Sequence, residues 1–376
     1  MKVALFIHSM RSGGAERVTA SISNYWARQG WSVVLITNTD TESDFYDLEP
    51  AVKRLSLHMA DDSTNALVAL TRNWKRIQEL RKLLRLESPD AAVGMMTTAN
   101  CVLALAGRGL GIRLVGSERI HPPMYPLGRA WQLIRRYTYP LLNVIVAQTQ
   151  RTADWISANI PGITVTVIPN PVELPLPDQQ PRRDPRDLVG LVGSSKLILA
   201  VGRLEEQKGF DLLLESFTEI VSRQHAWHLV IVGEGSARAD LEAKIAAHGV
   251  SRSVHLPGSV GNIGDWYKAA DIFVLSSRYE GFPNCLVEAM AHDLPVFAFD
   301  CDTGPRDLIE DMENGVLVAN GDCKALSKAI LLLMSDDERR VALARRAGDI
   351  RDRLGIEKIA NRWAEVLMPN GVADAE

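Results

Sequence analysis

The sequence predicts an α/β protein with two domains, each built around a parallel sheet. Its 376 residues are too many for one ordinary hydrophobic core. Short β-branched and aliphatic runs alternate with longer amphipathic patterns, and this alternating series occurs twice along the chain. Residues 168–187 lie between the two series and concentrate prolines and charges, so we expect no regular element there.

The expected elements and domains follow from these runs. In the first series the buried strands are residues 2–8, 32–38, 91–96, 113–118 and 143–149, with helices that include 16–29, 67–86 and 129–142. In the second series the strands are residues 196–202, 228–233, 253–258, 272–277, 295–299 and 315–318. We expect domains at 1–170 and 188–355, joined by a Pro-rich linker at 171–187. Residues 356–376 would form a terminal helix and tail that pack back toward the first domain.

Composition and charge narrow the class of protein. A net charge of -4 argues against nucleic-acid binding. Residues 1–172 hold 19 Lys and Arg against 13 Asp and Glu, whereas 173–376 hold 23 against 33. The basic first half favours an anionic acceptor or membrane surface there, and chance scatter of solvated charges is the alternative. Four cysteines without C-x-x-C spacing and the lack of a long apolar run predict a cytoplasmic protein.

A first candidate site for phosphate follows the first strand. Gly13 and Gly14 stand between this strand and a predicted helix, so the backbone can approach a ligand closely. The amides and dipole at a helix N-terminus favour an anion. The pattern is not G-x-G-x-x-G, so it does not indicate a nicotinamide dinucleotide, and a plain tight turn is the alternative.

A second candidate site lies in the other half of the chain. Glu280 stands just before a predicted helix, and Glu288 stands about one turn inside it. The amides near this helix start suit a diphosphate, and Glu288 can accept hydrogen bonds from a ribose diol. Arg203 and Lys208 follow a strand and could neutralise a diphosphate leaving group. The alternatives are a surface glutamate, a helix cap and a pair of solvated loop charges.

Together these motifs resemble a known family. GGAER at 13–17, GR-x4-KG at 202–209, and E-x7-E at 280–288 followed by A-M-A and P-V are similar to family 4 of the retaining glycosyltransferases. The resemblance covers nearly the whole chain. It implies the GT-B fold, an α/β architecture in which two Rossmann-like domains face each other across a deep cleft. The first would bind the acceptor and the second the nucleotide sugar.

The resemblance also implies roles for single residues. Gly14 would pack against the donor diphosphate, Glu288 would hold the ribose hydroxyls, and Val260 would lie in the loop that receives the nucleobase. His121 matches the family's first-domain histidine beside the anomeric carbon. The implied catalytic residues are His121, Arg203, Lys208 and Glu280, the last contacting donor-sugar hydroxyls. The implied donor site also contains Gly13, Gly281, Phe282, Pro283, Asn284, Cys285 and Leu286.

The reaction implied is transfer of a hexose or N-acetylhexosamine from UDP, with GDP next, to a glycan or a polyprenyl-linked glycolipid. No motif plainly supplies a nucleophilic carboxylate, so we expect a front-face mechanism that retains anomeric configuration. The sequence lacks D-x-D, H-E-x-x-H and Cys/His clusters, so we expect neither a metal nor another cofactor. Two alternatives are an epimerase on the same scaffold and a non-catalytic nucleotide-sugar-binding protein.

The helix expected at 67–86 could bind the acceptor or the inner face of the membrane. Its apolar face would consist of Leu70, Trp74, Ile77, Leu80 and Leu84. Its basic residues are Arg72, Lys75, Arg76, Lys82 and Arg85. Such a face suits anionic lipid or the diphosphate of a polyprenyl-linked acceptor, with an ordinary core-packing helix as the equal alternative. A second basic-aromatic stretch could add a basic surface that helps at a membrane, with an ordinary helix surface as the equal alternative. It comprises Arg129, Trp131, Arg135, Arg136 and Tyr137.

Overall fold

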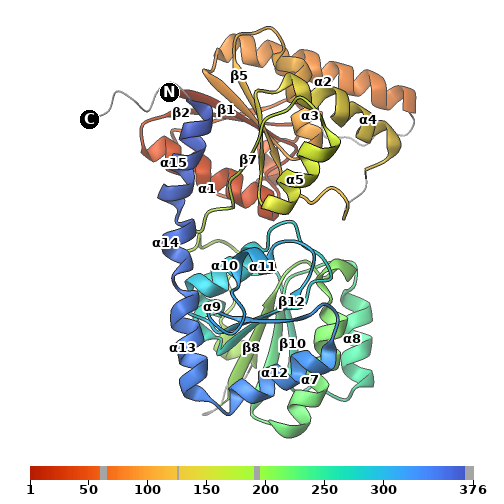
Figure 1. Ribbon diagram of the computed structural model, residues 1–376, viewed down its shortest axis with the longest axis vertical. Coiled ribbons are helices and arrows are strands. Elements are labelled where there is room, and N and C mark those ends of the chain that lie inside the picture. Colours follow the sequence, from red (N-terminus) through yellow and green to blue (C-terminus); the bar gives the residue numbers. More distant parts are fainter. Residues whose placement is uncertain (60–65, 125–126, 190–194, 369–376) are drawn as a thin grey trace. The chain divides into compact units, whose positions relative to one another are not determined.

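The computed structural model describes residues 1–59, 66–124, 127–189 and 195–368 (Figure 1). The chain forms two compact units. The first unit comprises Met1–Pro171 and the segment that begins at Ile356, and the second comprises Val172–Gly355.

A seven-stranded parallel sheet forms the centre of the first unit, in the order β3-β2-β1-β4-β5-β6-β7. Its strands are β1 (Lys2–Ile7), β2 (Ser32–Thr37), β3 (Lys53–Ser56), β4 (Ala91–Met95), β5 (Arg113–Glu118), β6 (Val144–Ala147) and β7 (Val165–Val167). Its helices are α1 (Gly14–Arg28), α2 (Ala66–Glu87), α3 (Thr97–Gly107), α4 (Arg129–Thr138), α5 (Gln150–Asn159) and α15 (Ile356–Leu367). The strand order reverses between β1 and β4, so their connections leave on opposite faces.

A six-stranded parallel sheet forms the centre of the second unit, in the order β10-β9-β8-β11-β12-β13. Its strands are β8 (Lys196–Val201), β9 (Trp227–Val232), β10 (Val254–Gly258), β11 (Ile272–Leu275), β12 (Val296–Asp300) and β13 (Val316–Ala319). Its helices are α6 (Pro185–Val189), α7 (Phe210–Arg223), α8 (Arg238–Ala247), α9 (Ile263–Ala269), α10 (Asn284–Ala291), α11 (Pro305–Leu308), α12 (Cys323–Met334), α13 (Asp337–Ala347) and α14 (Ile350–Leu354). The order reverses between β8 and β11.

Every strand that the sequence predicts is present, which confirms the α/β expectation. The sequence does not predict β3 and β7, because they are only four and three residues long and are not fully buried. The expectation that 168–187 holds no regular element is wrong at its end, where Pro185 begins α6. Proline suits this first helical position because its φ is helical and its missing N–H would have no partner.

The C-terminal helix belongs structurally to the first unit, where α15 lies along α1 (Figure 1). Its buried face includes Ile359 and Trp363. Arg362 donates from its guanidinium to the carbonyl of Val167, and Arg113 donates to the carbonyl of Val366 at 2.6 Å. Apolar burial and these two hydrogen bonds therefore attach the last helix to the sheet that the first residues begin.

Candidate donor-sugar site

The switch point of the second sheet brings together the two strongest sequence motifs. Lys208 ends a short 3-10 turn after β8, and Glu280 lies in the loop after β11. Because β8 and β11 are parallel neighbours, their carboxyl ends share one edge of the sheet. Ligands of open α/β sheets bind at this kind of edge.

Lys208 and Glu280 form a buried ion pair. The Lys208 Nζ donates to Oε1 of Glu280 at 2.6 Å, with side-chain exposures of 14% and 5%. Ser277 Oγ donates to the same oxygen at 2.6 Å. Burial pushes the pKa of Lys208 down, but attraction to Glu280 outweighs it and the pKa is raised, so the ammonium stays charged. Oε2 of Glu280 accepts no hydrogen bond from the residues that the structure describes.

Glu288 is buried one turn inside α10. The hydroxyl of Tyr267 donates to its Oε2 at 3.0 Å, and the side chain is 5% exposed. The ring of Tyr267 stacks on His292, with centroids 5.1 Å apart. This geometry excludes the alternative that Glu288 is a solvated surface residue, because a buried carboxylate needs fixed donors.

Thr303 and Gly304 stabilise the turn between Glu280 and Glu288. Thr303 donates from Oγ1 to the carbonyl of Glu280. Gly304 has φ +96, and a Cβ there would meet Pro283 at 2.6 Å, so this close packing needs glycine. Burial raises the pKa of the Cys285 thiol to about 12, which keeps it protonated and unsuited to nucleophilic attack.

The remaining members of the predicted donor site lie on the same turn. Gly281 and Asn284 are half-buried, whereas Phe282, Pro283 and Leu286 are buried. Asn284 begins α10. Arg203 is exposed on the loop that carries Lys208, and its charge acts on the pKa of Lys208. Two cations therefore lie at one end of the switch point.

The loops that carry Lys208 and Glu280 are tied to each other by residues that sequence reasoning missed. Arg278 forms a paired contact with Asp211 at 2.7 and 2.8 Å and donates to the carbonyl of Glu206 at 2.7 Å. Ser276 Oγ donates to the carbonyl of Lys208 at 2.9 Å. A Cβ on Gly209, which has φ +61, would meet the Ser276 carbonyl oxygen at 2.1 Å. The sequence does show Ser276 and Arg278 at the end of a predicted strand. It does not show that their partners follow another strand, β8.

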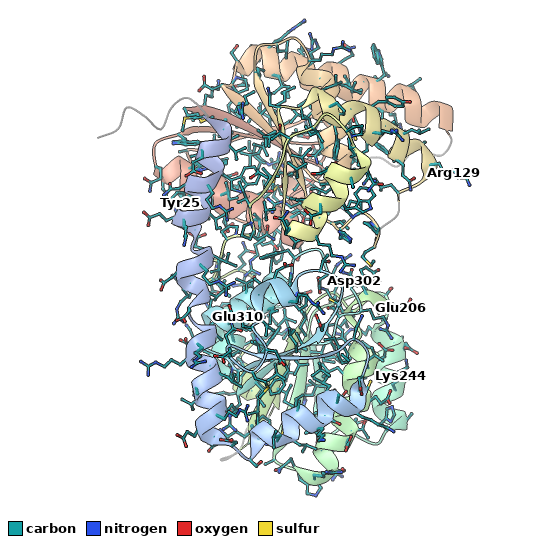
Figure 2. The ribbon with its side chains drawn as sticks, in the orientation of Figure 1. Tyr25, Arg129, Glu206, Lys244, Asp302 and Glu310 are labelled. Atoms are coloured by element: carbon teal, nitrogen blue, oxygen red, sulfur yellow. The ribbon has the colours of Figure 1, made fainter. Side chains whose placement is uncertain are left out.

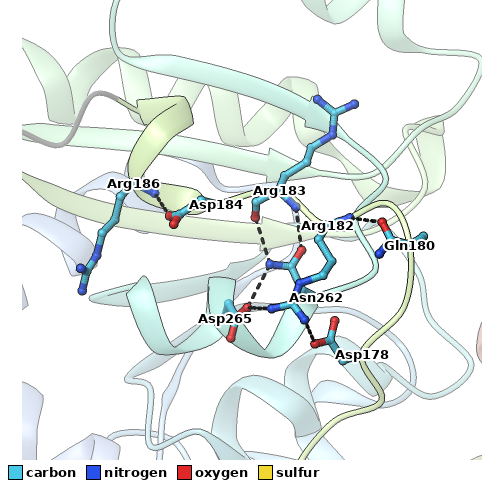
Figure 3. A network of polar contacts seen from close by, with 8 residues as sticks. All are labelled: Asp178, Gln180, Arg182, Arg183, Asp184, Arg186, Asn262 and Asp265. Atoms are coloured by element: carbon cyan, nitrogen blue, oxygen red, sulfur yellow. Dashed lines mark hydrogen bonds and ion pairs between the residues drawn. The ribbon is translucent and has the colours of Figure 1, made fainter.

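The loop expected to receive the nucleobase is clamped by the Pro-rich segment (Figure 3). Asn262 accepts from the amide of Arg183 and donates to its carbonyl, both at 3.0 Å, and it also donates to Asp265. The amide of Gly261 donates to the carbonyl of Pro181 at 2.7 Å. Val260, which is half-buried, stands directly before this clamp. The segment that was expected to be a linker is therefore a structural part of the second unit.

Gly13, Gly14 and His121 belong to the first unit. The backbone of Gly13 is hydrogen-bonded to Tyr46. The Gly13 amide donates to the Tyr46 oxygen at 3.3 Å, and the Tyr46 hydroxyl donates to the Gly13 carbonyl at 3.0 Å. The place of Gly13 and Gly14 in the donor site stays a prediction. His121 is 3% exposed, with Nδ1 3.1 Å from Thr152 Oγ1. Its catalytic role stays a prediction.

The basic helix differs in part from its prediction. Leu80 and Leu84 are buried, but Trp74 is 63% exposed and does not join the apolar face. Arg76 is half-buried and donates to the carbonyl of Met59 at 2.7 Å, which gives it a structural role. Leu70 lies outside the residues whose side chains the structure describes. The other basic residues of the prediction are exposed or half-buried: Arg72, Lys75, Lys82 and Arg85.

The second basic-aromatic stretch is α4. Arg129 lies on the surface at its start (Figure 2). Leu133 and Tyr137 are 55% and 73% exposed, so the outer face carries large apolar groups. Arg135 instead points inward and stacks over Trp155, 4.8 Å from the ring centroid. The prediction of a basic surface is therefore wrong for Arg135.

The described side chains and helices bear on metal binding and on membrane insertion. In the described parts of the chain, no three His, Cys, Asp or Glu side chains gather as a metal site would require. No described helix is long and apolar enough to cross a bilayer.

Two family models match most of the chain, and known glycosyltransferases align with nearly all of it. Residues 12–175 match the family model Glycosyltransferase Family 4, and residues 183–349 match Glycosyl transferases group 1. An uncharacterized glycosyltransferase of Haemophilus influenzae is 27% identical over 97% of this chain and 99% of its own. The GalNAc-α-(1→4)-GalNAc-α-(1→3)-diNAcBac-PP-undecaprenol α-1,4-N-acetyl-D-galactosaminyltransferase of Campylobacter jejuni is 26% identical over 98% of each chain.

Among solved structures, HepE of Anabaena in complex with UDP and glucose has a TM-score of 0.80. It is 19% identical, and the match covers 98% of this chain and 100% of HepE. The two parallel sheets and this neighbour show the GT-B fold. The chain belongs to the glycosyltransferases, with a family 4 segment in its first unit and a group 1 segment in its second.

Proposed function

We propose that this glycosyltransferase moves a hexose or N-acetylhexosamine from UDP to a glycan or a polyprenyl-diphosphate-linked glycolipid and retains the anomeric configuration. The observation that carries the proposal is the buried pair of Lys208 and Glu280 at the switch point of the second sheet. A buried cation at this edge suits a diphosphate leaving group. The Glu280 carboxylate beside it is held in place by Lys208 and Ser277, and it suits recognition of sugar hydroxyls.

In this proposal the two glutamates have separate roles. Glu280 uses Oε1 to hold Lys208 and Ser277, and Oε2 accepts a hydrogen bond from the donor sugar. Glu288 is oriented by Tyr267 and accepts from the ribose. Arg203 and Lys208 stabilise the charge that develops on the departing phosphate.

The same arrangement favours a front-face reaction. Glu280 is already bonded to a cation and a hydroxyl, which makes it a poor nucleophile for double displacement. The departing phosphate oxygen takes the proton of the acceptor hydroxyl while the new glycosidic bond forms on the same face. His121 orients the acceptor or the sugar.

The acceptor class rests on two kinds of support. The Campylobacter relative is named for a diphosphoundecaprenol-linked glycan acceptor and aligns over nearly its whole length. In this chain, Lys75, Lys82 and Arg85 are exposed on α2, and Leu133 and Tyr137 are exposed on α4. Basic and large apolar groups on one unit suit a peripheral place at the inner face of an anionic membrane.

The nucleotide and the metal requirement are further parts of the proposal. UDP is the nucleotide that accompanies HepE, and transfer of N-acetylgalactosamine is the activity named for the Campylobacter relative. Arg203 and Lys208 would take the charge-neutralising role that Mg²⁺ has in other transferases. We expect full activity in EDTA, with no gain on adding Mg²⁺ or Mn²⁺. A loss that returning the metal restores would contradict this.

The experiment that tests the function pairs a panel of UDP- and GDP-sugars with an undecaprenyl-diphosphate-linked glycan acceptor. We expect transfer from a UDP-hexose or UDP-N-acetylhexosamine, with an α-linkage by NMR. Donor incubated alone should stay unchanged apart from slow hydrolysis. A β-linked product would contradict retention, and conversion of the donor sugar without acceptor would indicate an epimerase.

A further inference from the structure

Arg119 is a buried guanidinium in the first unit, directly after β5. The residue is 6% exposed. Nη1 donates to Oδ1 of Asn170, and Nη2 lies 3.8 Å from the sulfur of Met95. Gln148 contacts the Asn170 amide at 2.7 Å in either orientation of its own amide. All these partners are neutral.

The charge of Arg119 is therefore not compensated by contact. No carboxylate of the described residues lies within ion-pair distance of it, and Nε is buried without a hydrogen-bond partner. Burial lowers the pKa of Arg119 to about 9, and the more distant charge of Glu16 offsets this in part. Buried charges in proteins are normally paired, because leaving one unpaired is strongly unfavourable.

A second unfavourable feature lies at the same edge of the sheet. Met96 has φ 81 and ψ 158, a region of backbone conformation that is almost confined to glycine. It follows Met95, whose sulfur contacts Arg119, at the end of β4. Strands β4 and β5 are paired neighbours, so the strained residue and the unpaired charge share one carboxyl edge. Residues held against such costs cluster at ligand sites.

We propose that Arg119 is an anion-binding residue and that a phosphate group of a substrate supplies its counter-charge. A guanidinium offers five N–H donors in a plane, which suits phosphate oxygens, and a neutral partner set leaves its charge for a ligand. The proposal rests on the proposed function for the identity of the phosphate, which belongs either to the donor diphosphate or to a diphosphate-linked acceptor.

The alternative is that Arg119 only anchors Asn170, and stability distinguishes the two. Removing an uncompensated buried charge should leave the thermal unfolding midpoint unchanged or raise it, whereas removing a structural anchor should lower it. Arg54 is the matched control, because it pairs with Asp44 at 2.8 and 2.9 Å and both side chains are largely buried. We expect Arg119→Met to keep or raise the midpoint and Arg54→Met to lower it.

Inorganic pyrophosphate is the probe for the anion. It should raise the unfolding midpoint of wild type and of Arg54→Met, whereas Arg119→Met should respond clearly less than Arg54→Met, and the remaining response would come from Arg203 and Lys208. Arg119→Lys keeps a charge with fewer donors and should retain a smaller response. Saturating UDP distinguishes the sources: abolition of the Arg119-dependent response assigns the donor phosphate, and its persistence assigns the acceptor phosphate.

Kinetics completes the test. The KM for the assigned substrate should rise about 10- to 100-fold in Arg119→Met, with a smaller change in kcat. A lowered midpoint together with an unchanged pyrophosphate response would overturn the proposal. The unfolding measurements need no turnover, so they stand even if no UDP-sugar is transferred and the proposed function fails.

Discussion

Lys208 and Glu280 stand 72 positions apart in the sequence and meet at 2.6 Å in a buried ion pair. Each of the two side chains fixes the other at the carboxyl edge of the second sheet. One oxygen of Glu280 is committed to the pair, so the carboxylate presents its other oxygen in a defined direction. The pair therefore has a structural role and a proposed catalytic role, and substitutions can separate them.

Lys208→Met should lower both stability and turnover. It leaves Glu280 buried without its cation, which costs about 3 kcal/mol or more of unfolding free energy. Adding Glu280→Gln should restore much of that stability, because a neutral amide needs no counter-charge, but it should not restore activity. We expect kcat to fall about 100- to 1000-fold in both variants. Denaturant unfolding and steady-state kinetics measure the two effects.

Lys196→Ala is the control for that series. Lys196 pairs with Asp271 at 2.7 Å at the start of β8, the opposite end of the strand that leads to Lys208. Its side chain is 45% exposed, so the substitution should change neither the unfolding free energy nor kcat appreciably. Turnover in Lys208→Met equal to wild type would refute the catalytic role.

Asp211→Asn should weaken the protein in a pH-dependent way. The hydrogen bonds from Arg278 hold the pKa of Asp211 below its ordinary value of 3.8. A lowered folded-state pKa stabilises the protein above the ordinary pKa, and this contribution disappears as the pH falls through the folded-state value. The variant should therefore unfold about 1 kcal/mol more easily at pH 7, and the difference should shrink below about pH 4.

Chemical denaturation of wild type and Asp211→Asn at several pH values checks this expectation. The control is Asp240→Asn, which removes an exposed pairing with Lys244 on α8 and should have little effect at any pH. A gap between wild type and Asp211→Asn that is constant from pH 7 to pH 3 would show that Arg278 does not act through the charge of Asp211.

Some of this site could be predicted from the sequence, because its information is local. The runs that become β8 and β11 are aliphatic, and Lys208 and Glu280 each stand a few residues after one of them. The parallel pairing of those strands then brings the loops together. Tyr267 and Ser277 could not be predicted in the same way, since they act through contacts with Glu288 and Glu280 that depend on packing.

The same limit explains the errors in the first unit. Helical periodicity places Trp74 on the apolar side with Leu80, but the side of a helix that is buried depends on the elements beneath it. Arg76 and Arg135 look like surface charges in the sequence. In the structure, Arg76 donates to the carbonyl of Met59, and Arg135 stacks over the indole ring of Trp155.

Charge reversal on α2 should weaken membrane binding. Lys75 and Arg85 are exposed, so Lys75→Glu with Arg85→Glu changes surface charge without breaking a buried contact. We expect roughly tenfold or more weaker binding to vesicles that contain an anionic phospholipid, with little change on neutral vesicles. Lys324→Glu with Lys328→Glu on α12 is the matched control, because both lysines are exposed in the other unit. Sedimentation with vesicles measures the difference, and equal loss in both pairs would point to net charge alone.

Gly261→Ala should impair recognition of the nucleobase. A Cβ at this position would meet the carbonyl oxygen of Gln179 at 1.9 Å, so the Pro-rich segment must move off the base loop. Gly264→Ala is the matched control on the adjacent helix, because its Cβ would meet Leu176 at 3.8 Å, an ordinary contact.

The expected result is a KM effect. The loop is proposed to contact the base and not the reacting atoms. Gly261→Ala should therefore raise the KM for the UDP-sugar about tenfold, with kcat less affected. The ratio of kcat/KM for the UDP-sugar to kcat/KM for the GDP-sugar should fall. Gly264→Ala should behave as wild type. If Gly261→Ala lowered kcat with both donors equally and left their KM values alone, the base would have to bind elsewhere, because a displaced clamp that leaves donor affinity intact cannot be supporting the base.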